Sequence, residues 1–502
     1  MSSERERWYR RRIVIGLGAL VAVLVGAAAV FAITREDDVS NPDVEFRAEP
    51  TQTPVGAGEP PPRKAKKKKA KKRGPLEGFR WAHYGYTKDR RRYLAADFDV
   101  RPPFKRRWNW DGDVLLEFPP ILVGNRLFLT KNDGTVVSLN RTTGKVVWKR
   151  DMGYLAASSP AYGDKRIYVT VLERDRGVEA GRVAALRARD GKLVWSRPLA
   201  SRTESSPLHD GDFVYFGAED GSVYAMRDGS GKVAWKFRAS GAVKGGLALD
   251  GGKLYFGAYG GTAYAVWKDS GKQAWSNGAP GGNLYSTPAV AFGRVYIGST
   301  NGRMYSFSSS TGRLAWSRGT GSYVYASPAV AHVPGGSPTV YFGSYDGTFY
   351  ALDARTGNTR WTYRDGGKIS GAATVVGNIV YYSNWGKRNS TALGARTGRR
   401  VWTTTRGAFN PVISNGEMIY LTGFSSVAAF EPRSAAKARA GKKQRGGGRK
   451  QRAQRKQRAQ RKQRAQRAQR AERRQRAERR QRAERRQRAE RRRRAERRRS
   501  RR

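Results

Sequence analysis

The sequence predicts an all-β fold, an eight-bladed β-propeller of four-stranded antiparallel blades, preceded by one transmembrane helix and flanked by disordered basic segments. Three observations predict it. A short motif ending in tryptophan returns at a period near 40 residues, four short apolar runs separate its returns, and one orphan tryptophan strand precedes the first unit. A fixed period of this length marks repeated supersecondary units, which must be identified before any other feature is interpreted.

The repeated motif, here called the turn–tryptophan motif, first reads Thr143-Gly144-Lys145-Val146-Val147-Trp148 and returns six times. The gaps between its successive tryptophans are 47, 40, 40, 41, 45 and 41 residues. Within one unit, from Ser327 to Trp361, four short runs of alternating apolar residues are separated by Gly, Asp and Asn turn residues. This is the pattern of four antiparallel strands. Units of four strands at this period are propeller blades.

The number of blades follows from one aromatic residue that marks the second strand of each unit. The eight marker residues are Phe128, Tyr168, Tyr215, Tyr255, Tyr296, Tyr341, Tyr381 and Tyr420. The last unit ends at Phe430 without a tryptophan strand, whereas Trp108 stands alone, 40 residues before Trp148. We therefore expect the N-terminal strand around Trp108 to complete the last blade, because closure of the ring removes exposed strand edges.

The outer-strand tryptophans are interpreted as packing residues between blades and not as a stacking platform for a ligand, because each stands at the same place in its unit. These structural tryptophans are Trp108, Trp148, Trp195, Trp235, Trp275, Trp316, Trp361 and Trp402. The repeated Asp-Gly and Asn-Gly pairs are likewise interpreted as turn residues and not as metal ligands.

An uncharged apolar run extends from Ile13 to Ile33. As a helix it would span about 30 Å, the thickness of a bilayer's hydrocarbon core. Five arginines precede it and three acidic residues follow it, so the positive-inside rule places residues 1–12 in the cytoplasm. We expect a single-pass protein of the cytoplasmic membrane, anchored by residues 13–33, with the propeller and the C-terminal tail extracytoplasmic. A cleaved signal peptide is the competing interpretation.

Residues 34–77 have the composition of a disordered Pro/Lys-rich linker, since they lack the apolar periodicity needed to bury surface. Within it, nine basic residues lie between Arg63 and Arg73. We expect contacts with an anionic lipid or cell-envelope polymer there, and a solvated spacer is the alternative. The candidate polyanion-binding residues of this segment are Lys66, Lys67, Lys68, Lys69, Lys71 and Lys72.

The propeller is predicted to cover residues 78–432 and to be followed by a low-complexity basic tail, residues 433–502. The tail holds 35 basic and 5 acidic residues and supplies much of the formal net charge of +57. Its alanines recur every six residues and form no continuous helical stripe, so we expect a solvated, partly helical arm and no coiled coil. Such an arm suits salt-sensitive polyanion binding, with Arg473, Arg474, Arg479 and Arg480 as candidates. A passive tail and a nucleic-acid-binding tail are the alternatives.

The repeat from Ser327 to Trp361, Ser-Pro-Ala-Val through Val-Tyr-Phe-Gly-Ser-Tyr-Asp-Gly to Ala-Arg-Thr-Gly and Trp, resembles the PQQ-like (quinoprotein-type) β-propeller repeat. This family includes quinoprotein alcohol dehydrogenases and the outer-membrane-assembly lipoprotein BamB. The resemblance covers about Trp81 to Pro432. Residues Trp81 to Tyr86 together with Arg90-Arg91-Arg92-Tyr93 resemble the lead-in of BamB-like members, so a non-enzymatic BamB-like propeller is the expectation.

The resemblance to the dehydrogenases implies a quinone held against a vicinal disulfide, with a calcium ion beside it. The chain has no cysteine, which excludes that disulfide and every cysteine-based metal site. No segment matches the family's calcium ligands or catalytic aspartate. We therefore expect no catalytic residue, no cofactor and no metal, and His209 is interpreted as a solvated turn residue.

The function predicted from the sequence is a membrane-anchored extracytoplasmic propeller that acts as a non-catalytic binding or scaffold module. A protein partner is expected on one propeller face, and the basic arms are expected to contact anionic envelope material. A PQQ-dependent dehydrogenase and a nucleic-acid-binding protein are the alternatives. Because loops carry the function of a propeller, the two longest departures from the period, Leu172 to Arg182 and His332 to Pro338, are candidate recognition loops.

Overall fold

The computed structural model describes residues 38–48, 74–96, 100–410, 412–434 and 475–494, with five single positions between 457 and 469. The chain divides into two units, residues 1–433 and residues 434–502, and each is described by itself. The apolar run from Ile13 to Ile33 and the lysines from Lys66 to Lys72 lie outside the described residues.

Eight antiparallel sheets, each with four propeller strands, make up the first unit. From the inner to the outer strand, blade 1 is β5 (Ile121–Val123), β6 (Arg126–Thr130), β7 (Thr135–Asn140) and β8 (Val146–Asp151). Blade 2 is β9 (Ala161–Gly163), β10 (Arg166–Val171), β11 (Arg182–Arg187) and β12 (Leu193–Pro198); blade 3 is β13 (Leu208–Asp210), β14 (Phe213–Gly217), β15 (Ser222–Arg227) and β16 (Val233–Arg238). Blade 4 is β17 (Ala248–Asp250), β18 (Lys253–Gly257), β19 (Ala263–Trp267) and β20 (Gln273–Asn277); blade 5 is β21 (Ala289–Ala291), β22 (Arg294–Gly298), β23 (Arg303–Ser308) and β24 (Leu314–Gly319). Blade 6 is β25 (Ala329–Ala331), β26 (Thr339–Gly343), β27 (Thr348–Asp353) and β28 (Thr359–Arg364); blade 7 is β29 (Thr374–Val376), β30 (Ile379–Asn384), β31 (Asn389–Gly394) and β32 (Arg400–Thr404). Blade 8 is β33 (Val412–Ser414), β34 (Ile419–Thr422), β35 (Ser426–Pro432) and β4 (Phe104–Asp111).

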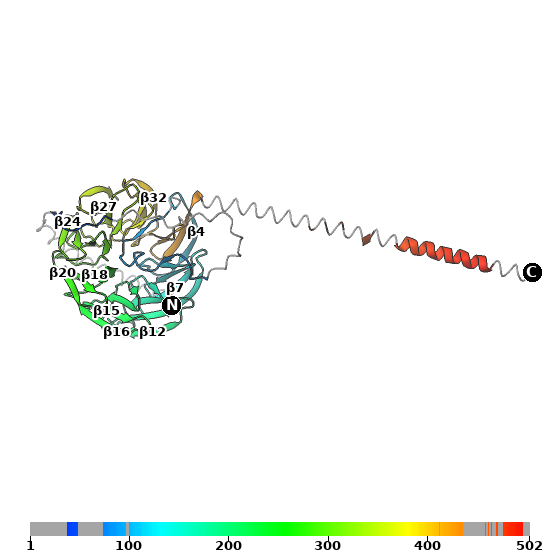
Figure 1. Cartoon of the computed structure of the whole chain (residues 1–502), viewed down its shortest axis with the longest axis horizontal. Coiled ribbons are helices and arrows are strands. Elements are labelled where there is room, and N and C mark those ends of the chain that lie inside the picture. The colour runs from blue at the N-terminus through cyan, green and yellow to red at the C-terminus, as the bar shows by residue number, and fades with distance from the viewer. Residues whose placement is uncertain are drawn as a thin grey trace, which may run out of the picture. The chain divides into compact units, whose positions relative to one another are not determined.

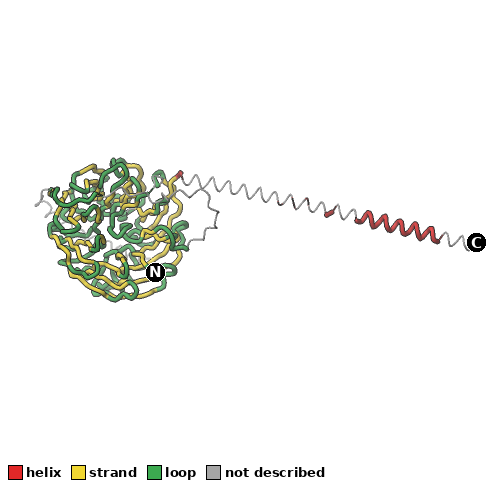
Figure 2. The backbone as a smooth tube through the Cα atoms, in the orientation of Figure 1, coloured by secondary structure: helices red, strands yellow, loops and turns green. Residues whose placement is uncertain are grey.

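The blades follow one another round a ring, as the labelled outer strands show in Figure 1 and the alternation of strands and loops shows in Figure 2. The ring closes on itself because β4 pairs with β35 along its whole length, from Pro432 opposite Phe104 to Ser426 opposite Asp111. The predicted eight-bladed propeller of four-stranded antiparallel blades is therefore confirmed, and the orphan tryptophan strand is the outer strand of blade 8.

Seven of the eight structural tryptophans contact the glycine of the turn–tryptophan motif in the next blade. In seven of the eight positions the indole Nε1 donates a hydrogen bond of 2.6 to 3.1 Å to a carbonyl in the next blade's outer turn: Trp108 to Arg141, Trp148 to Ala188, Trp195 to Asp228, Trp235 to Lys268, Trp275 to Ser309, Trp316 to Ala354 and Trp361 to Ala395. The glycine three residues later lies under the ring, at φ between 67° and 75°. A Cβ at any of these glycines would lie 2.5 to 2.7 Å from the indole.

The exception is Trp402 in blade 7. The next blade has no outer turn, because its two outer strands, β35 and β4, come from opposite ends of the propeller sequence. The Trp402 ring instead meets Phe104 and Phe430 edge-on, at centroid distances of 5.3 and 5.8 Å. In every blade a β-bulge interrupts the pairing of the two outer strands beside the tryptophan, for example between Ala185 and Leu186 in blade 2. The residue opposite each tryptophan is Ser or Ala, which leaves room for the indole.

A lead-in segment, residues 79–94, runs along the inner strands and is here called the axial strap. It pairs with blade 1 through β2 (Arg80–Trp81) and with blade 7 through β3 (Tyr93–Leu94). Between these strands its carbonyls accept hydrogen bonds from inner-strand amides, including Tyr162 to Ala82, Leu249 to Lys88, Val290 to Asp89, Val330 to Arg91 and Val375 to Arg92. The strap thus satisfies backbone donors that would otherwise face the channel unpaired.

The side chain of Arg90 fastens the strap to the ring. It is fully buried, and its guanidinium donates hydrogen bonds to the carbonyls of Tyr84, Ser206, Pro207 and Leu247. Burial, reinforced by the nearby charge of Arg92, lowers the Arg90 pKa to about 9. Buried charges need such a full set of acceptors.

Residues 38–48, predicted to belong to the disordered linker, form an ordered segment on blade 5. β1 (Val39–Ser40) pairs antiparallel with β24 and adds a fifth strand outside that blade. The prediction missed this contact because it depends on arginines about 250 residues further along the chain, which no local pattern reveals.

In the tail, predicted to be a solvated, partly helical arm, residues 475–494 form an exposed helix, here called the tail helix. Its residues are good helix formers. The prediction of a single-pass protein in the cytoplasmic membrane is corrected, because no helix among the described residues is long and apolar enough to cross a membrane. The tail helix cannot serve, since its Arg and Glu side chains are exposed and a bilayer core needs about 20 apolar residues.

The tryptophan–glycine contact predicts different effects for two neighbouring glycines of blade 3. Gly231→Ala places a Cβ 2.5 Å from Trp195 at φ +67°, whereas Gly229→Ala meets nothing within 4 Å. We expect Gly231→Ala to destabilise the propeller by about 2 to 4 kcal/mol, because backbone strain adds to displacement of the indole. Thermal unfolding of both variants checks this, and equal melting temperatures would contradict it.

Candidate functional site

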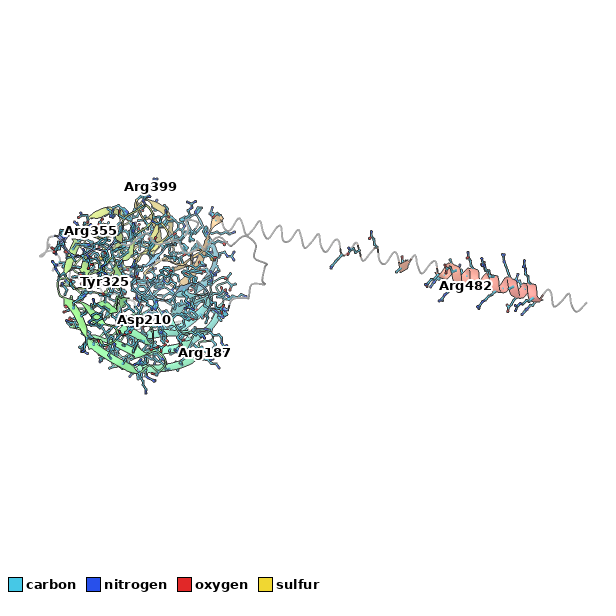
Figure 3. The ribbon with its side chains drawn as sticks, in the orientation of Figure 1. Arg187, Asp210, Tyr325, Arg355, Arg399 and Arg482 are labelled. Atoms are coloured by element: carbon cyan, nitrogen blue, oxygen red, sulfur yellow. The ribbon has the colours of Figure 1, made fainter. Side chains whose placement is uncertain are left out.

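A cavity of about 380 Å³ lies on the propeller axis. It is situated where the loops that lead into each inner strand meet, and the axial strap contributes to its wall. Seven of the eight blades contribute to its lining, which comprises Tyr84, Glu117, Phe118, Glu204, Ser206, Lys244, Gly245, Gly246, Tyr259, Tyr285, Thr287, Tyr325, Ser327, Tyr345, Ser370, Gly371, Ala372, Trp385, Phe409 and Asn410. In Figure 3, Tyr325 lies inside the ring, whereas Arg187 and Arg399 lie at its periphery.

One position of the repeat supplies most of the side chains that distinguish the blades at this cavity. In blade 6 this position is Tyr325, two residues before the Ser327-Pro328 pair that leads into the inner strand, and the other blades have a matching position. From blade 1 to blade 8 it holds Glu117, Ala157, Glu204, Lys244, Tyr285, Tyr325, Ser370 and Ala408. Six of these eight residues line the cavity: Glu117, Glu204, Lys244, Tyr285, Tyr325 and Ser370. These six are here called the axial ring.

Two positions later, four blades carry a hydroxyl residue that links the blade to the preceding one: Ser159, Ser206, Thr287 and Ser327. The Ser206 hydroxyl accepts from the Ser159 amide at 3.0 Å, and the Ser327 hydroxyl accepts from the Thr287 amide at 3.0 Å. The axial-ring residues differ from blade to blade. The sequence predictions did not include them, although their position stands two residues before the Ser-Pro or Thr-Pro pair in four blades, which was a usable signal.

One side of the cavity is charged. The Lys244 ammonium lies 3.1 Å from a Glu204 oxygen and 2.8 Å from a Glu219 oxygen, and the Tyr285 hydroxyl donates to the other Glu204 oxygen at 2.9 Å. Burial alone would lower the Lys244 pKa, but these two carboxylates raise it. The single lysine of the wall is therefore charged and already neutralised.

Glu117 has a different environment from Glu204. Burial and the nearby Glu204 charge raise its pKa to about 7, although Lys244 acts in the opposite direction. Its backbone carbonyl accepts from the Asn410 amide group, but within the described part of the chain no hydrogen bond or ion pair reaches its carboxylate. A partly buried carboxylate without a partner favours its neutral form.

The other side of the cavity is aromatic. Tyr325 meets Tyr285 edge-on at a centroid distance of 5.8 Å and lies 5.0 Å from Tyr345. Trp385 stacks on Phe409 at 6.2 Å. The site therefore combines an aromatic wall from the later blades with a carboxylate-rich wall from the earlier ones.

The histidines do not form a metal site. His209, predicted as a solvated turn residue, lies in β13, where its ring stacks on Tyr168 at 5.1 Å and its Nε2 lies 3.4 Å from an Asp228 oxygen. Leu208, the preceding residue of β13, is fully buried, and the inner strand runs on through His209 to Asp210. Across the described residues, no group of three or more His, Asp or Glu side chains could hold a metal ion.

The predicted recognition loops lie at opposite ends of the propeller. Leu172 to Arg182 connects the middle strands β10 and β11 at the cavity end, where Leu155 bridges to Glu173. His332 to Pro338 connects β25 and β26 at the other end. Of the predicted polyanion-binding residues, Arg479 and Arg480 lie exposed on the tail helix, and Arg473, Arg474 and the lysines from Lys66 to Lys72 lie outside the described residues.

Comparisons with known proteins place the fold among quinoprotein-type propellers. A family model described as outer membrane protein assembly factor BamB matches residues 132–244, 219–440 and 326–476. Among solved structures, BamB from Moraxella catarrhalis is similar with a TM-score of 0.53 at 18% identity, over 66% of this chain and 98% of that chain. No curated protein matches this chain.

Two dehydrogenases are similar to a comparable degree. The quinohemoprotein alcohol dehydrogenase ADHIIG from Pseudomonas putida HK5 gives a TM-score of 0.58 at 15% identity, over 70% of this chain and 80% of that chain. A europium-containing methanol dehydrogenase gives 0.59 at 14% identity, over 70% and 98%. At these identities the likeness establishes the fold alone, so whether the chain is an enzyme depends on its own residues.

The residues of the cavity do not fit the quinone PQQ, which carries three carboxylates. Lys244 is the only lining lysine or arginine, and two glutamates already neutralise it. Glu117 and Glu204 would repel an anionic ligand. The cavity therefore has the wrong charge for this cofactor.

The raised pKa of Glu117 predicts a specific pH dependence of stability. The folded state holds this proton more tightly than the unfolded chain does, so the contribution of Glu117 to stability falls as the pH rises from about 4.5 through 7. Glu117→Gln removes this loss and should stabilise the chain at pH 8 by about 2 kcal/mol relative to its effect at pH 4. Thermal unfolding at both pH values checks it, with the exposed Glu417→Gln as control; an identical pH dependence of Glu117→Gln and the parent chain would contradict it.

Proposed function

Because the chain belongs to the family of BamB-type β-propellers, we propose that it is a non-catalytic binding module whose axial cavity receives a cationic side chain of a protein partner. The observation that carries the proposal is the chemistry of the axial ring, which sets carboxylates against aromatic rings. Propellers commonly place recognition in their non-repeating loops, and the axial ring is the non-repeating part of this cavity.

Charge favours a cation over an anion. Glu204 and Glu219 neutralise Lys244, so Glu117 is the carboxylate left to pair with a ligand. An arriving ammonium or guanidinium would lower the Glu117 pKa and hold it ionised. The ion pair would form away from bulk water, where charge-assisted hydrogen bonds are stronger.

The aromatic wall fits the same ligand. Tyr285, Tyr325 and Tyr345 present rings to the cavity, and ring faces attract cations within about 6 Å. Lys368 gives an internal precedent, because its ammonium lies 5.7 Å from the centre of the Tyr345 ring and 5.9 Å from that of the Trp385 ring. An arginine or lysine side chain would also cover apolar ring surface with its stem.

The volume agrees with one or two side chains and not with a folded domain. Ligand pockets range from roughly 300 to 1,000 Å³, and this cavity lies at the lower end. A partner would therefore insert an anchor residue on the axis and rest on the surrounding loops. A protein partner also agrees with the BamB family, whose description is that of an outer membrane protein assembly factor.

The proposal is tested with two capped tripeptides, acetyl-Ala-Arg-Ala-amide and its analogue with neutral citrulline in place of arginine. We expect the arginine peptide to bind at least about fivefold more tightly at pH 8, because a charged pair is worth about 1 kcal/mol or more here. Glu117→Gln should abolish the difference and Tyr325→Leu should weaken it, while Glu417→Gln leaves it unchanged. Titration calorimetry measures the affinity of both peptides for the parent chain and for the three variants.

Two results would contradict the proposal. Equal binding of the arginine and citrulline peptides would remove the cationic ligand. Stoichiometric binding of PQQ with Ca²⁺, accompanied by reduction of a dye with an alcohol as donor, would establish a quinoprotein dehydrogenase instead.

We propose a second binding function for the basic arms, supported by the composition of the tail helix. Residues 475–494 hold 11 arginines and 3 glutamates, all exposed. A helix of this length extends about 30 Å, and its charges point to all sides of the helix axis. The arms, including Arg473, Arg474, Arg479, Arg480 and the lysines from Lys66 to Lys72, would contact anionic lipids, polyanionic polymers or nucleic acid without sequence preference.

Deleting residues 435–502 tests this second function. We expect affinity for a 20-base-pair DNA duplex and for phosphatidylglycerol vesicles to fall by at least tenfold at 50 mM salt, with a shallower dependence on salt. Fluorescence anisotropy and vesicle co-sedimentation measure the two. Equal binding with and without the tail would contradict it.

A further inference from the structure

The rim of blade 5 holds residues 38–48, here called the rim segment, through contacts that resemble those of a bound peptide. The Asn41 amide donates to the Ala315 carbonyl at 2.7 Å, and its side-chain amide donates to the Leu314 carbonyl at 2.8 Å. At the far end of the segment, the Arg47 amide donates to the Phe292 carbonyl at 2.9 Å. Val39 and Ser40 supply the short strand pairing between these contacts and Asp38.

Blade 5 meets the acidic residues of the segment with arginines. An Asp38 oxygen lies 2.9 Å from Arg303 and accepts from the Gly319 amide at 2.8 Å, and its other oxygen lies 2.6 Å from Arg318. Asp43 pairs with Arg313 at 2.7 Å, and this hydrogen bond lowers the Asp43 pKa. The carboxylates are thus recognised individually and at fixed positions.

Arg294 reads the backbone of the segment. Its side chain is almost fully buried, with 1% of its surface exposed, and its guanidinium donates to the carbonyls of Val44 and Glu45. Val44 is buried as well, and Phe46 lies 5.4 Å from Phe292. A guanidinium buried under a peptide needs that peptide to satisfy its donors.

Another blade shows what blade 5 requires. Blade 2 carries arginines at the matching strand positions, Arg166, Arg182 and Arg197. There, however, Arg166 is engaged by Asp164 and Asp228. Pro198 stands at the position of Gly319 and has no amide hydrogen to donate. Among the described sheets, blade 5 is accordingly the one whose outer strand carries an added strand.

The rim segment is held by these contacts more than by continuity of the chain. Residues 49–73, 25 positions, separate it from the next described residue of the propeller. The strand pairing itself involves two residues. A short strand at the end of a long connection can dissociate and be replaced by an equivalent strand, as in strand addition to a sheet edge.

We propose that the rim of blade 5 is an exchangeable docking site for an acidic extended strand, which takes the rim segment from its own chain or from a second copy of the chain. Arg294, Arg303, Arg313 and Arg318 form the site. Exchange between copies would join two propellers through their rims and leave both axial cavities open, so the inference does not depend on the proposed ligand of the cavity.

The test uses the full-length chain and a fluorescein-labelled peptide with the sequence of residues 36–48. In the variant Asp38→Lys/Asp43→Lys the chain's own segment is repelled, and we expect the peptide to bind at least tenfold more tightly than to the parent chain. The parent's own segment competes at an effective concentration of about 1 mM. Asp38→Asn, a milder change, should give an intermediate affinity. Fluorescence anisotropy measures binding, and thermal unfolding verifies the fold.

Two controls separate site-specific docking from attraction to the basic arms. A peptide of the same residues in scrambled order should bind the Asp38→Lys/Asp43→Lys chain at least tenfold more weakly. Adding Arg303→Glu/Arg318→Glu to that chain should remove binding of the ordered peptide. Equal binding of the ordered and scrambled peptides, or no gain in the Asp38→Lys/Asp43→Lys chain, would overturn the proposal.

Discussion

The propeller depends on one repeated contact, the tryptophan of each blade on the glycine turn of the next. The indole needs a neighbour without a Cβ and a carbonyl within reach of Nε1. In each motif the tryptophan packs on the next blade, whereas the glycine receives the tryptophan of the preceding blade, so the motif needs both residues. Seven such contacts fix the angle between successive blades. At the eighth boundary the outer strands of blade 8, β35 and β4, are not joined by a turn, and Phe104 and Phe430 pack on Trp402 instead. Because the angle is fixed, the loops that enter the inner strands always converge on the axis.

This regularity brings the axial ring together at the cavity. Two positions after the ring, hydroxyls such as those of Ser206 and Ser327 link neighbouring blades. At the ring itself the blades differ: carboxylates at Glu117 and Glu204, a lysine at Lys244, tyrosines at Tyr285 and Tyr325. The strap contributes to the wall on which these residues converge, held by the buried Arg90. The result is a polar cavity of defined charge inside a strongly basic protein.

Much of the fold could be predicted from the sequence because its determinants are local and repeated. The period gave the blades, and the orphan Trp108 gave the closure, since its register matches the other tryptophans. The contacts of non-repeating segments could not be predicted. Asp38 meets Arg303 and Arg318 across some 265 residues or more, and the axial strap binds six blades through backbone carbonyls that any sequence provides. The membrane-spanning helix was predicted from an apolar run with its flanking charges and has no counterpart among the described helices. The axial ring was visible in principle, but only as variation two residues before the Ser-Pro or Thr-Pro pair of four blades, a signal that needs the fold to be interpreted.

The central claim is that recognition occurs at the axial ring, and hydrogen–deuterium exchange of the full chain, with and without saturating acetyl-Ala-Arg-Ala-amide, tests it most directly. The account predicts slower amide exchange in the loops that carry the ring, residues 116–118, 203–206, 243–246, 284–287, 324–327 and 369–372, and unchanged exchange in the outer turns that hold the glycines. Protection confined to the outer turns or to the rim of blade 5, or no protection in the axial loops, would contradict it.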